Sequence, residues 1–319
     1  MAGPLTLPQR VTIREVGPRD GLQAEKPLAV EARARLIDAL STTGVPKIEA
    51  VSFVSPTAVP AMAEAAEVWK RVHPAKDVAY SALVPNRRGA EAAAEAGGFA
   101  SLQAFLGAAE LYNRKNLGKS VAESVGDVAD VVAVARSAGL PVEVSISAAF
   151  GDPYEGDVAP QRVLEVAERV LSVGAQSISL GDTTGMGTPT GVWEVVGLMR
   201  DRLGEVPLNL HFHDTRGTAM ANVLAALQIG VTEFDASIGG LGGSPFAPGA
   251  NGNLATEDLA HMLMAMGTEV GIDFDRLLEA SRLAEELVGH PLASQVSKAG
   301  PRWAGWPPRA RGVAGEAKP

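Results

Sequence analysis

The stretch VEVSISAAFGDPYEGDVAPQRVLEVAERVLSVGAQSISLGD, residues 142–182, holds two β-branched or apolar runs with a longer charged segment between them. The runs 142–150 and 177–182 predict strands. The segment 161–175 predicts a helix with a glycine near its end, as is usual at helix C-termini. A strand, a helix and a second strand in succession indicate that the two strands are parallel.

The same alternation runs through most of the chain. Further strand candidates occupy residues 11–16, 47–53, 78–84, 101–106, 208–214 and 233–239. Further helical patterns occupy residues 29–44, 121–139, 191–204 and 217–230. Eight such units favour an α/β fold of the closed (β/α)8 TIM-barrel type with a C-terminal helical extension, and an open doubly wound sheet is the alternative.

The expected domain division is an N-terminal extension at residues 1–10, the barrel at 11–292 and a flexible tail at 293–319. The end of the chain, KAGPRWAGWPPRARGVAGEAKP, is rich in proline, glycine and basic residues and has no periodicity, which is typical of a poorly ordered tail. Trp303 and Trp306 leave open that this segment packs on the barrel or on a neighbouring subunit.

Composition narrows the class of protein. The 319 residues are 46% hydrophobic and 20% charged, which is typical of a globular protein. A net charge of −9 argues against nucleic acid and anionic membranes as partners, although a local basic pocket for a phosphorylated ligand stays open. The start of the sequence lacks a secretory signal and no run resembles a membrane span, so a cytoplasmic location is expected. The chain has no cysteine, which removes disulfides, thiolate metal sites and cysteine nucleophiles.

In a (β/α)8 barrel, chemistry takes place at the carboxyl ends of the strands. In LNLHFHD (208–214), His211 and His213 are two residues apart, so both side chains point to the same face of the strand, toward the barrel axis. There they would hold a metal ion. A pair of hydrogen-bonded interior histidines is an equally good interpretation of this short pattern.

Charged residues at other strand ends have competing interpretations. Arg19 and Asp20, in EVGPRDGLQ, follow the first strand and suit an oxyanion and a hard cation, while a solvated turn is the alternative. Glu49 lies in an apolar strand, where a structural partner for Arg19 is as good a reading as a catalytic group. Asp182, after the sixth strand, is read first as a turn or capping residue.

Five motifs in order resemble the 3-hydroxy-3-methylglutaryl-CoA lyases of the DRE-TIM metallolyase superfamily, over about residues 11–290. These are VGPRDGLQ, IEAVSFVSP, SLGDTTGMGTP, HFHDTRGTAMAN and GGLGGSPFAPGANGNLATEDL. PRDGLQ with SFVSP favours the lyases over the Claisen-type synthases. The resemblance implies cleavage of a 3-hydroxyacyl-CoA to acetyl-CoA and a ketone, which is acetoacetate for the usual substrate, in leucine degradation.

The resemblance also implies roles for individual residues. The ligands of a divalent cation would be Asp20, His211, His213 and Asn253. Magnesium or manganese is the usual cation, and cobalt and zinc stay open. Arg19 would stabilise the enolate, His211 would also transfer protons, and Glu49 and Asp182 would position these groups. The acyl-CoA end would lie near Lys26 and Asn86, and the superfamily suggests a homodimer.

The sequence departs from the family at Ser244, where the family has a cysteine that protonates the acetyl-CoA enolate. A serine hydroxyl is far less acidic than a thiol, whose pKa is about 8.5. Three readings stay open. Another group supplies the proton and the lyase persists; the substrate is another 3-hydroxyacyl-CoA or the reaction runs toward condensation; or activity is lost and only metal or CoA-ester binding remains.

Overall fold

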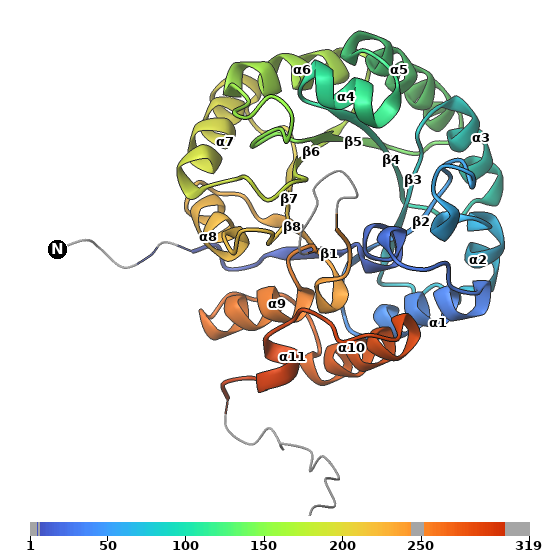
Figure 1. Ribbon diagram of the computed structural model, residues 1–319, viewed down its shortest axis with the longest axis vertical. Helices are drawn as coiled ribbons and strands as arrows, with labels where there is room; N and C mark the ends of the chain where they lie inside the picture. Colours follow the sequence, from blue (N-terminus) through green and yellow to red (C-terminus); the bar gives the residue numbers. More distant parts are fainter. Residues whose placement is uncertain (1–4, 6, 244–251, 304–319) are drawn as a thin grey trace, which may run out of the picture.

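The computed structural model describes residues 5, 7–243 and 252–303. Its centre is a closed barrel of eight parallel strands in sequential order, which excludes the open sheet. In Figure 1 the strands form an inner ring and the helices an outer one. The strands are β1 (Thr12–Glu15), β2 (Lys47–Ser52), β3 (Ala79–Leu83), β4 (Ser101–Gly107), β5 (Val142–Ser147), β6 (Ser177–Asp182), β7 (Leu208–Phe212) and β8 (Glu233–Ala236).

Helices connect successive strands and cover the barrel. Those between strands are α1 (Val30–Ser41), α2 (Ala65–Arg71), α3 (Arg87–Ala96), α4 (Glu110–Leu117), α5 (Val121–Ser137), α6 (Pro160–Ser172), α7 (Pro189–Leu203) and α8 (Ala219–Gln228). After β8 come α9 (Thr256–Ala265), α10 (Phe274–Val288) and α11 (Val296–Ala299). Short helical turns are η1 (Gly17–Gly21), η2 (Leu22–Ala24), η3 (Pro60–Met62) and η4 (Ile238–Gly240).

The β5–α6–β6 unit shows why these residues adopt this fold. Side chains of β5 alternate between buried and half-buried, as a strand with two different faces requires. Pro160 begins α6, where its missing N–H costs no hydrogen bond, and the apolar face of the helix packs on the barrel. The strand candidates were thus correctly located, and most end one to three residues earlier than expected.

The segment expected as a flexible tail, residues 293–319, is described as far as Trp303. The described part packs against the barrel: Ala293 N–H donates to Gly239 O (2.9 Å), and Ser294 Oγ bonds Asp258 (2.8 Å). Trp303 stacks on His261 with ring centroids 5.3 Å apart. The expected division at residue 293 therefore does not coincide with the end of packing, because short polar side chains and one aromatic ring anchor this stretch. Trp306 lies outside the described residues.

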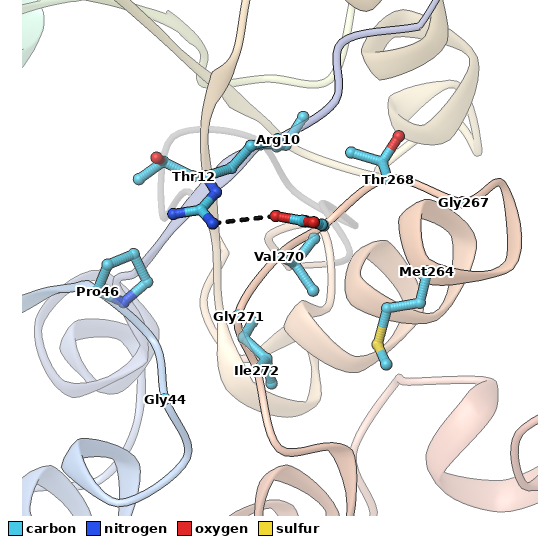
Figure 2. A pocket seen from close by; sticks show the side chains of 12 residues that line it. Arg10, Thr12, Gly44, Pro46, Met264, Gly267, Thr268, Val270, Gly271 and Ile272 are labelled. Atoms are coloured by element: carbon cyan, nitrogen blue, oxygen red, sulfur yellow. Dashed lines mark hydrogen bonds and ion pairs between the residues drawn. The ribbon is translucent and has the colours of Figure 1, made fainter.

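Two further features bear on function. Within the described ranges, no helix combines the length and apolar character that crossing a bilayer requires. A cavity of about 640 Å³ opens at the amino ends of β1 and β2, beside the turn between α9 and α10. Figure 2 shows this cavity and the ion pair that Arg10 makes at its edge. The partner of Arg10 is Glu269, at 3.0 Å. The cavity lies at the opposite end of the barrel from the residues singled out above.

Candidate active site

The turn η1 brings Arg19 and Asp20 to the carboxyl end of the barrel. The N–H groups of Arg19, Asp20 and Gly21 all donate to the carbonyl of Val16, at 3.1, 2.7 and 3.2 Å, so the chain coils tightly as it leaves β1. A side chain at Gly17 would collide with the Glu15 carboxylate, since a Cβ there would lie 2.6 Å from Oε1. The turn thus points two adjacent, oppositely charged side chains into the barrel.

Asp20, His211 and His213 form a buried cluster whose potential ligand atoms all lie within 4.8 Å of one another. The two Nε2 atoms are 3.1 Å apart, and His211 Nε2 is 3.8 Å from Asp20 Oδ2. Burial and the charge of His211 lower the pKa of His213 to about 3, so that ring stays neutral. For Asp20, burial is outweighed by Arg19 and the histidines, which lower its pKa to about 2. A neutral imidazole and an ionised carboxylate are the forms in which these groups bind metals.

Asn253 completes the cluster from the far side of the glycine-rich stretch. Its Nδ2 donates to Asp20 Oδ2 (2.7 Å) and to Leu241 O (3.0 Å), which fixes the orientation of the amide. Among the described residues, its buried Oδ1 has no hydrogen-bond partner, nor has His213 Nδ1. A buried amide oxygen without a partner is costly unless something else binds it. The donor set of carboxylate, two imidazoles and amide oxygen therefore fits a divalent cation.

Arg19 is held between two carboxylates. It donates from Nε to Glu49 Oε2 (2.6 Å) and from Nη1 to Asp20 Oδ1 (2.5 Å), and its Nη2 forms an ion pair with Glu49 Oε2 at 2.5 Å. Its side chain is 13% exposed, whereas that of Glu49 is 1% exposed. Burial raises the pKa of Glu49, although the charge of Arg19 opposes this. Glu49 is thus the buried partner that aims the guanidinium.

Asp182 makes the turn contacts expected of it and also keeps one free oxygen. Its Oδ1 accepts from the N–H groups of Met186 (2.8 Å) and Gly187 (3.0 Å). Its Oδ2 is buried and has no partner within the described part of the chain. Burial raises the pKa of Asp182 to about 6, against the effect of those two hydrogen bonds. Such a carboxyl can exchange a proton near neutral pH.

The two residues expected near the acyl-CoA end differ in their surroundings. Asn86 caps α3 by accepting from Gly89 N–H (3.1 Å) and lines a cavity of about 420 Å³ at the carboxyl ends of β2 and β3. Lys26 lies exposed between η2 and α1, and it does not line this cavity. Ser244 lies outside the described residues.

Two residues of this site were missed in the sequence. Asp235 Oδ2 is 3.0 Å from His211 Nδ1, and Arg14 binds both oxygens of Asp235. The signal available was the two-residue period in EFDASIG, which places Asp235 on the interior face of its strand, and the lone arginine in VTIREV. Neither pattern tells which residues of the neighbouring strands Asp235 and Arg14 will contact.

Comparison with known proteins agrees with this geometry. The model of the HMGL-like family matches residues 10–284. The chain is 45% identical to hydroxymethylglutaryl-CoA lyase of Bacillus subtilis, over 90% of this chain and 96% of the relative. It is 44% identical to the mitochondrial hydroxymethylglutaryl-CoA lyase of Homo sapiens, over 92% of this chain and 90% of the relative.

Solved structures give the same result. The crystal structure of the Bacillus subtilis HMG-CoA lyase superposes with a TM-score of 0.89 at 44% identity, covering 92% of this chain and 98% of that one. An HMG-CoA lyase of Acinetobacter baumannii in complex with coenzyme A and 3-methylmalate has a TM-score of 0.89 at 39% identity, covering 94% and 98%. With its barrel, its cluster and these matches along nearly the whole chain, the protein belongs to the HMGL-like family, that of the hydroxymethylglutaryl-CoA lyases.

Proposed function

We propose that this protein is a divalent-metal-dependent carbon–carbon lyase that cleaves 3-hydroxy-3-methylglutaryl-CoA to acetyl-CoA and acetoacetate. The observation that carries the proposal is the cluster of Asp20, His211 and His213 beside the Arg19 guanidinium, at the end of the barrel where this fold does its chemistry. Relatives at 44–46% identity bear the corresponding name.

Asp20, His211, His213 and Asn253 would hold the cation, which we propose to be magnesium or manganese. Cobalt and zinc suit the two imidazoles equally well. When bound, the cation supplies Lewis acidity that lowers the pKa of a substrate hydroxyl. The neutral ring of His213 and the free amide oxygen of Asn253 are the features of this chain that support the assignment.

The protein's own groups then serve the bond cleavage. The hydroxyl proton leaves to a base, the C2–C3 bond breaks, and its electron pair moves onto the thioester oxygen. Arg19 stabilises that developing oxyanion, and Glu49 and Asp20 hold the guanidinium in place. Proton transfer is assigned to the free oxygen of Asp182, whose pKa of about 6 suits reversible exchange, while His211 serves as a ligand of the cation. Protonation of the enolate carbon releases acetyl-CoA.

We place the CoA portion along the carboxyl ends of β2 and β3. The cavity of about 420 Å³ there is lined by Asn86, Arg88, Ser52 and Ser55, which offer hydrogen-bond donors to a pantetheine or phosphate group. Support comes from the Acinetobacter baumannii HMG-CoA lyase, whose structure contains coenzyme A. Lys26 remains a proposed contact for a phosphate group at the rim.

The test is direct. Purified protein with manganese and 3-hydroxy-3-methylglutaryl-CoA is expected to form acetoacetate and acetyl-CoA in equal amounts. Prior treatment with a chelator is expected to abolish the reaction, and added manganese to restore it. Absence of product at high enzyme concentration would contradict the proposal.

Ser244 favours a second candidate, a lyase for a related 3-hydroxyacyl-CoA or an enzyme that runs toward condensation. The Ser244→Cys variant separates the two, because it restores the acidic group without changing its size much. A large gain on 3-hydroxy-3-methylglutaryl-CoA would show that the serine limits the usual reaction. No gain, together with faster turnover of another thioester, would favour the second candidate. CoA-ester binding with no turnover of any thioester would instead indicate a binding protein.

The cellular assignments are also proposals. If the substrate is the usual one, the reaction belongs to leucine degradation. We propose a cytoplasmic location. A relative from Danio rerio is named as cytoplasmic, whereas the relative from Homo sapiens is named as mitochondrial. A homodimer is proposed by analogy with the superfamily, and light scattering of the purified protein tests it.

A further inference from the structure

The barrel interior beneath the metal cluster is polar. In most (β/α)8 barrels this space is filled by branched aliphatic side chains. Here a connected network of hydrogen-bonded side chains reaches into it from six strands. Its members are Arg14, Gln103, Glu143, Ser179, Asn209 and Asp235. Burying so many polar groups costs free energy unless each is paired, whereas an aliphatic interior has no such requirement. A polar interior is therefore expected where the network has a function.

The network meets the metal cluster at one contact. Asp235 Oδ2 lies 3.0 Å from His211 Nδ1, and the two residues are direct neighbours in the register of β7 and β8. A carboxylate only accepts hydrogen bonds, so Nδ1 must carry the proton. The lone pair of the neutral ring is then on Nε2, the atom that faces His213 and Asp20. This contact therefore determines which nitrogen of His211 is available.

Arg14 fixes the carboxylate of Asp235 from the other side. Its Nε is 2.7 Å from Oδ1 and its Nη2 is 3.0 Å from Oδ2, a two-point contact between planar groups. Asn209 Nδ2 adds a third hydrogen bond to Oδ1 at 2.9 Å. The remaining amino group of Arg14 binds Glu143 at 2.6 Å. Asp235 therefore cannot rotate without breaking several bonds, and it cannot offer a donor to His211.

We propose that Asp235, held by Arg14, is a positioning residue that keeps His211 in the Nδ1–H tautomer and so directs Nε2 to the cation. The inference rests on the proposed metal site, but not on the identity of the substrate. Carboxylates that accept a hydrogen bond from a metal-binding histidine orient its ring. Their removal typically weakens metal affinity about 10- to 100-fold. A purely structural network would leave the tautomer and the metal affinity unchanged.

The test uses the full chain and two readouts other than activity. In protein labelled with ¹⁵N-histidine and saturated with magnesium, long-range ¹H–¹⁵N spectra are expected to show His211 protonated on Nδ1 alone. A proton on Nε2 of the wild-type residue would overturn the inference without any variant being needed. The chain has five histidines, so a His211→Gln spectrum suffices for assignment.

Asp235→Asn supplies the second readout. Two donors, Arg14 Nε and Asn209 Nδ2, face Oδ1, and one, Arg14 Nη2, faces Oδ2. The amide oxygen is therefore expected at the Oδ1 position, and the amide nitrogen would face His211 and force its proton onto Nε2, with loss of the contact to Arg14 Nη2. The manganese dissociation constant, measured from the free-ion electron paramagnetic resonance signal, is expected to rise about 10- to 100-fold. Glu233→Gln is the matched control, two residues earlier on β8 and paired with Lys47 at 2.7 Å, and it is expected to leave manganese binding unchanged.

Unchanged manganese affinity in folded Asp235→Asn would overturn the inference. An equal loss in the Glu233→Gln control would do the same, because it would indicate a general effect of β8. If the wild type cleaved none of the thioesters tested, while the His211 tautomer and the manganese affinities were as expected, only the proposed function would be refuted.

Discussion

At the scale of single residues, the site depends on adjacent side chains of opposite charge. Arg19 and Asp20 are consecutive, yet η1 turns them so that the arginine contacts Glu49 while the aspartate faces the histidines. Burial opposes ionisation of both Arg19 and Asp20, and each is charged because a partner of opposite charge lies within hydrogen-bond distance. Replacing one partner therefore changes the neighbour as well.

Arg19→Met is predicted to lower kcat by about 10²- to 10³-fold, because it removes the cation that faces the developing oxyanion. The manganese affinity is expected to stay within a few-fold of wild type, since Asp20 keeps its charge and its bond from Asn253. Steady-state kinetics with 3-hydroxy-3-methylglutaryl-CoA and manganese titration measure the two quantities. Arg10→Met, at the opposite end of the barrel, is the control and is expected to leave kcat unchanged. Equal kcat values in the two variants would refute the role of Arg19.

At the scale of elements, the C-terminal end of the glycine-rich stretch is joined to the end of β7 and to the residues that follow β7 and β8. Asp214 N–H donates to Gly252 O (3.1 Å), and Leu254 N–H donates to Phe212 O (3.0 Å). Ser237 N–H donates to Leu254 O (2.9 Å). These bonds place Asn253 against the histidines from the other end of the stretch. The position of Asn253, one of the proposed metal ligands, is thus set by backbone contacts and not by its own side chain alone.

Gly252→Ala is predicted to weaken manganese binding by at least about tenfold, by displacing Asn253. A Cβ at residue 252 would lie 2.0 Å from Gly240 O and 2.1 Å from Gly242 O, and backbone cannot yield as a side chain does. Circular dichroism is expected to show an unchanged barrel.

Gly197→Ala in α7 is the control, because a methyl group there meets nothing within 4 Å. It is expected to keep manganese binding and to raise stability by up to about 1 kcal/mol. Wild-type affinity in Gly252→Ala would show that the close approach of these backbone segments does not position Asn253.

At the scale of the whole molecule, two buried carboxyls hold together the chain that follows β8: Glu15 joins β1 to η4 and α9, and Glu257 joins α9 to η4. Glu15 accepts from the N–H groups of Gly17 (2.7 Å) and Ile238 (2.8 Å) and from Thr256 Oγ1 (2.6 Å). Glu257 accepts from Gly239 N–H at 2.8 Å. Burial raises the pKa of each to about 7. Both carboxyls therefore link pH to the stability of the closed barrel.

Because the pKa of Glu257 rises from 4.5 to about 7 on folding, the folded protein binds its proton more tightly than the unfolded chain does. Its contribution to stability is full below about pH 4.5 and is lost as the pH rises to about 7. The free energy of unfolding of wild type minus that of Glu257→Gln is predicted to fall by about 1.4 kcal/mol per pH unit between about pH 5 and 7.

Urea unfolding of the two proteins at several pH values measures this difference. Glu15 titrates in both proteins, so most of its own contribution cancels in the difference; its coupling to the charge of Glu257 is the smallest of the causes that shift its pKa. Parallel curves for wild type and variant across this range would contradict the prediction.

Sequence reasoning located the strands because the signal for each is local. A run of β-branched residues, a glycine after a helix and the two-residue period of His211 and His213 all lie within a few positions of one another. The candidate ligands Asp20, His211 and His213 were identified in the same way, as polar residues at strand ends. Their meeting in one cluster followed from the expectation that such ends share one rim of a barrel.

Asp235 and Arg14 could not be found in that way. Each is a single charged residue in a short strand, and an ion pair within the barrel wall is as good a reading as any. Their contacts are determined by the register of the strands. Asp235 is paired with Arg14 between β1 and β8, and with His211 between β7 and β8. The first and last strands are more than 200 residues apart in sequence, and no local pattern carries their alignment.

The sequence by itself thus determined the eight repeated units, the face on which each side chain lies and the residue types able to bind a cation. Closure of the barrel decided which of those side chains touch. Periodicity is a property of neighbouring residues, whereas contact across β1, β8 and β7 depends on how hydrogen bonding aligns strands that the chain brings together only when it folds.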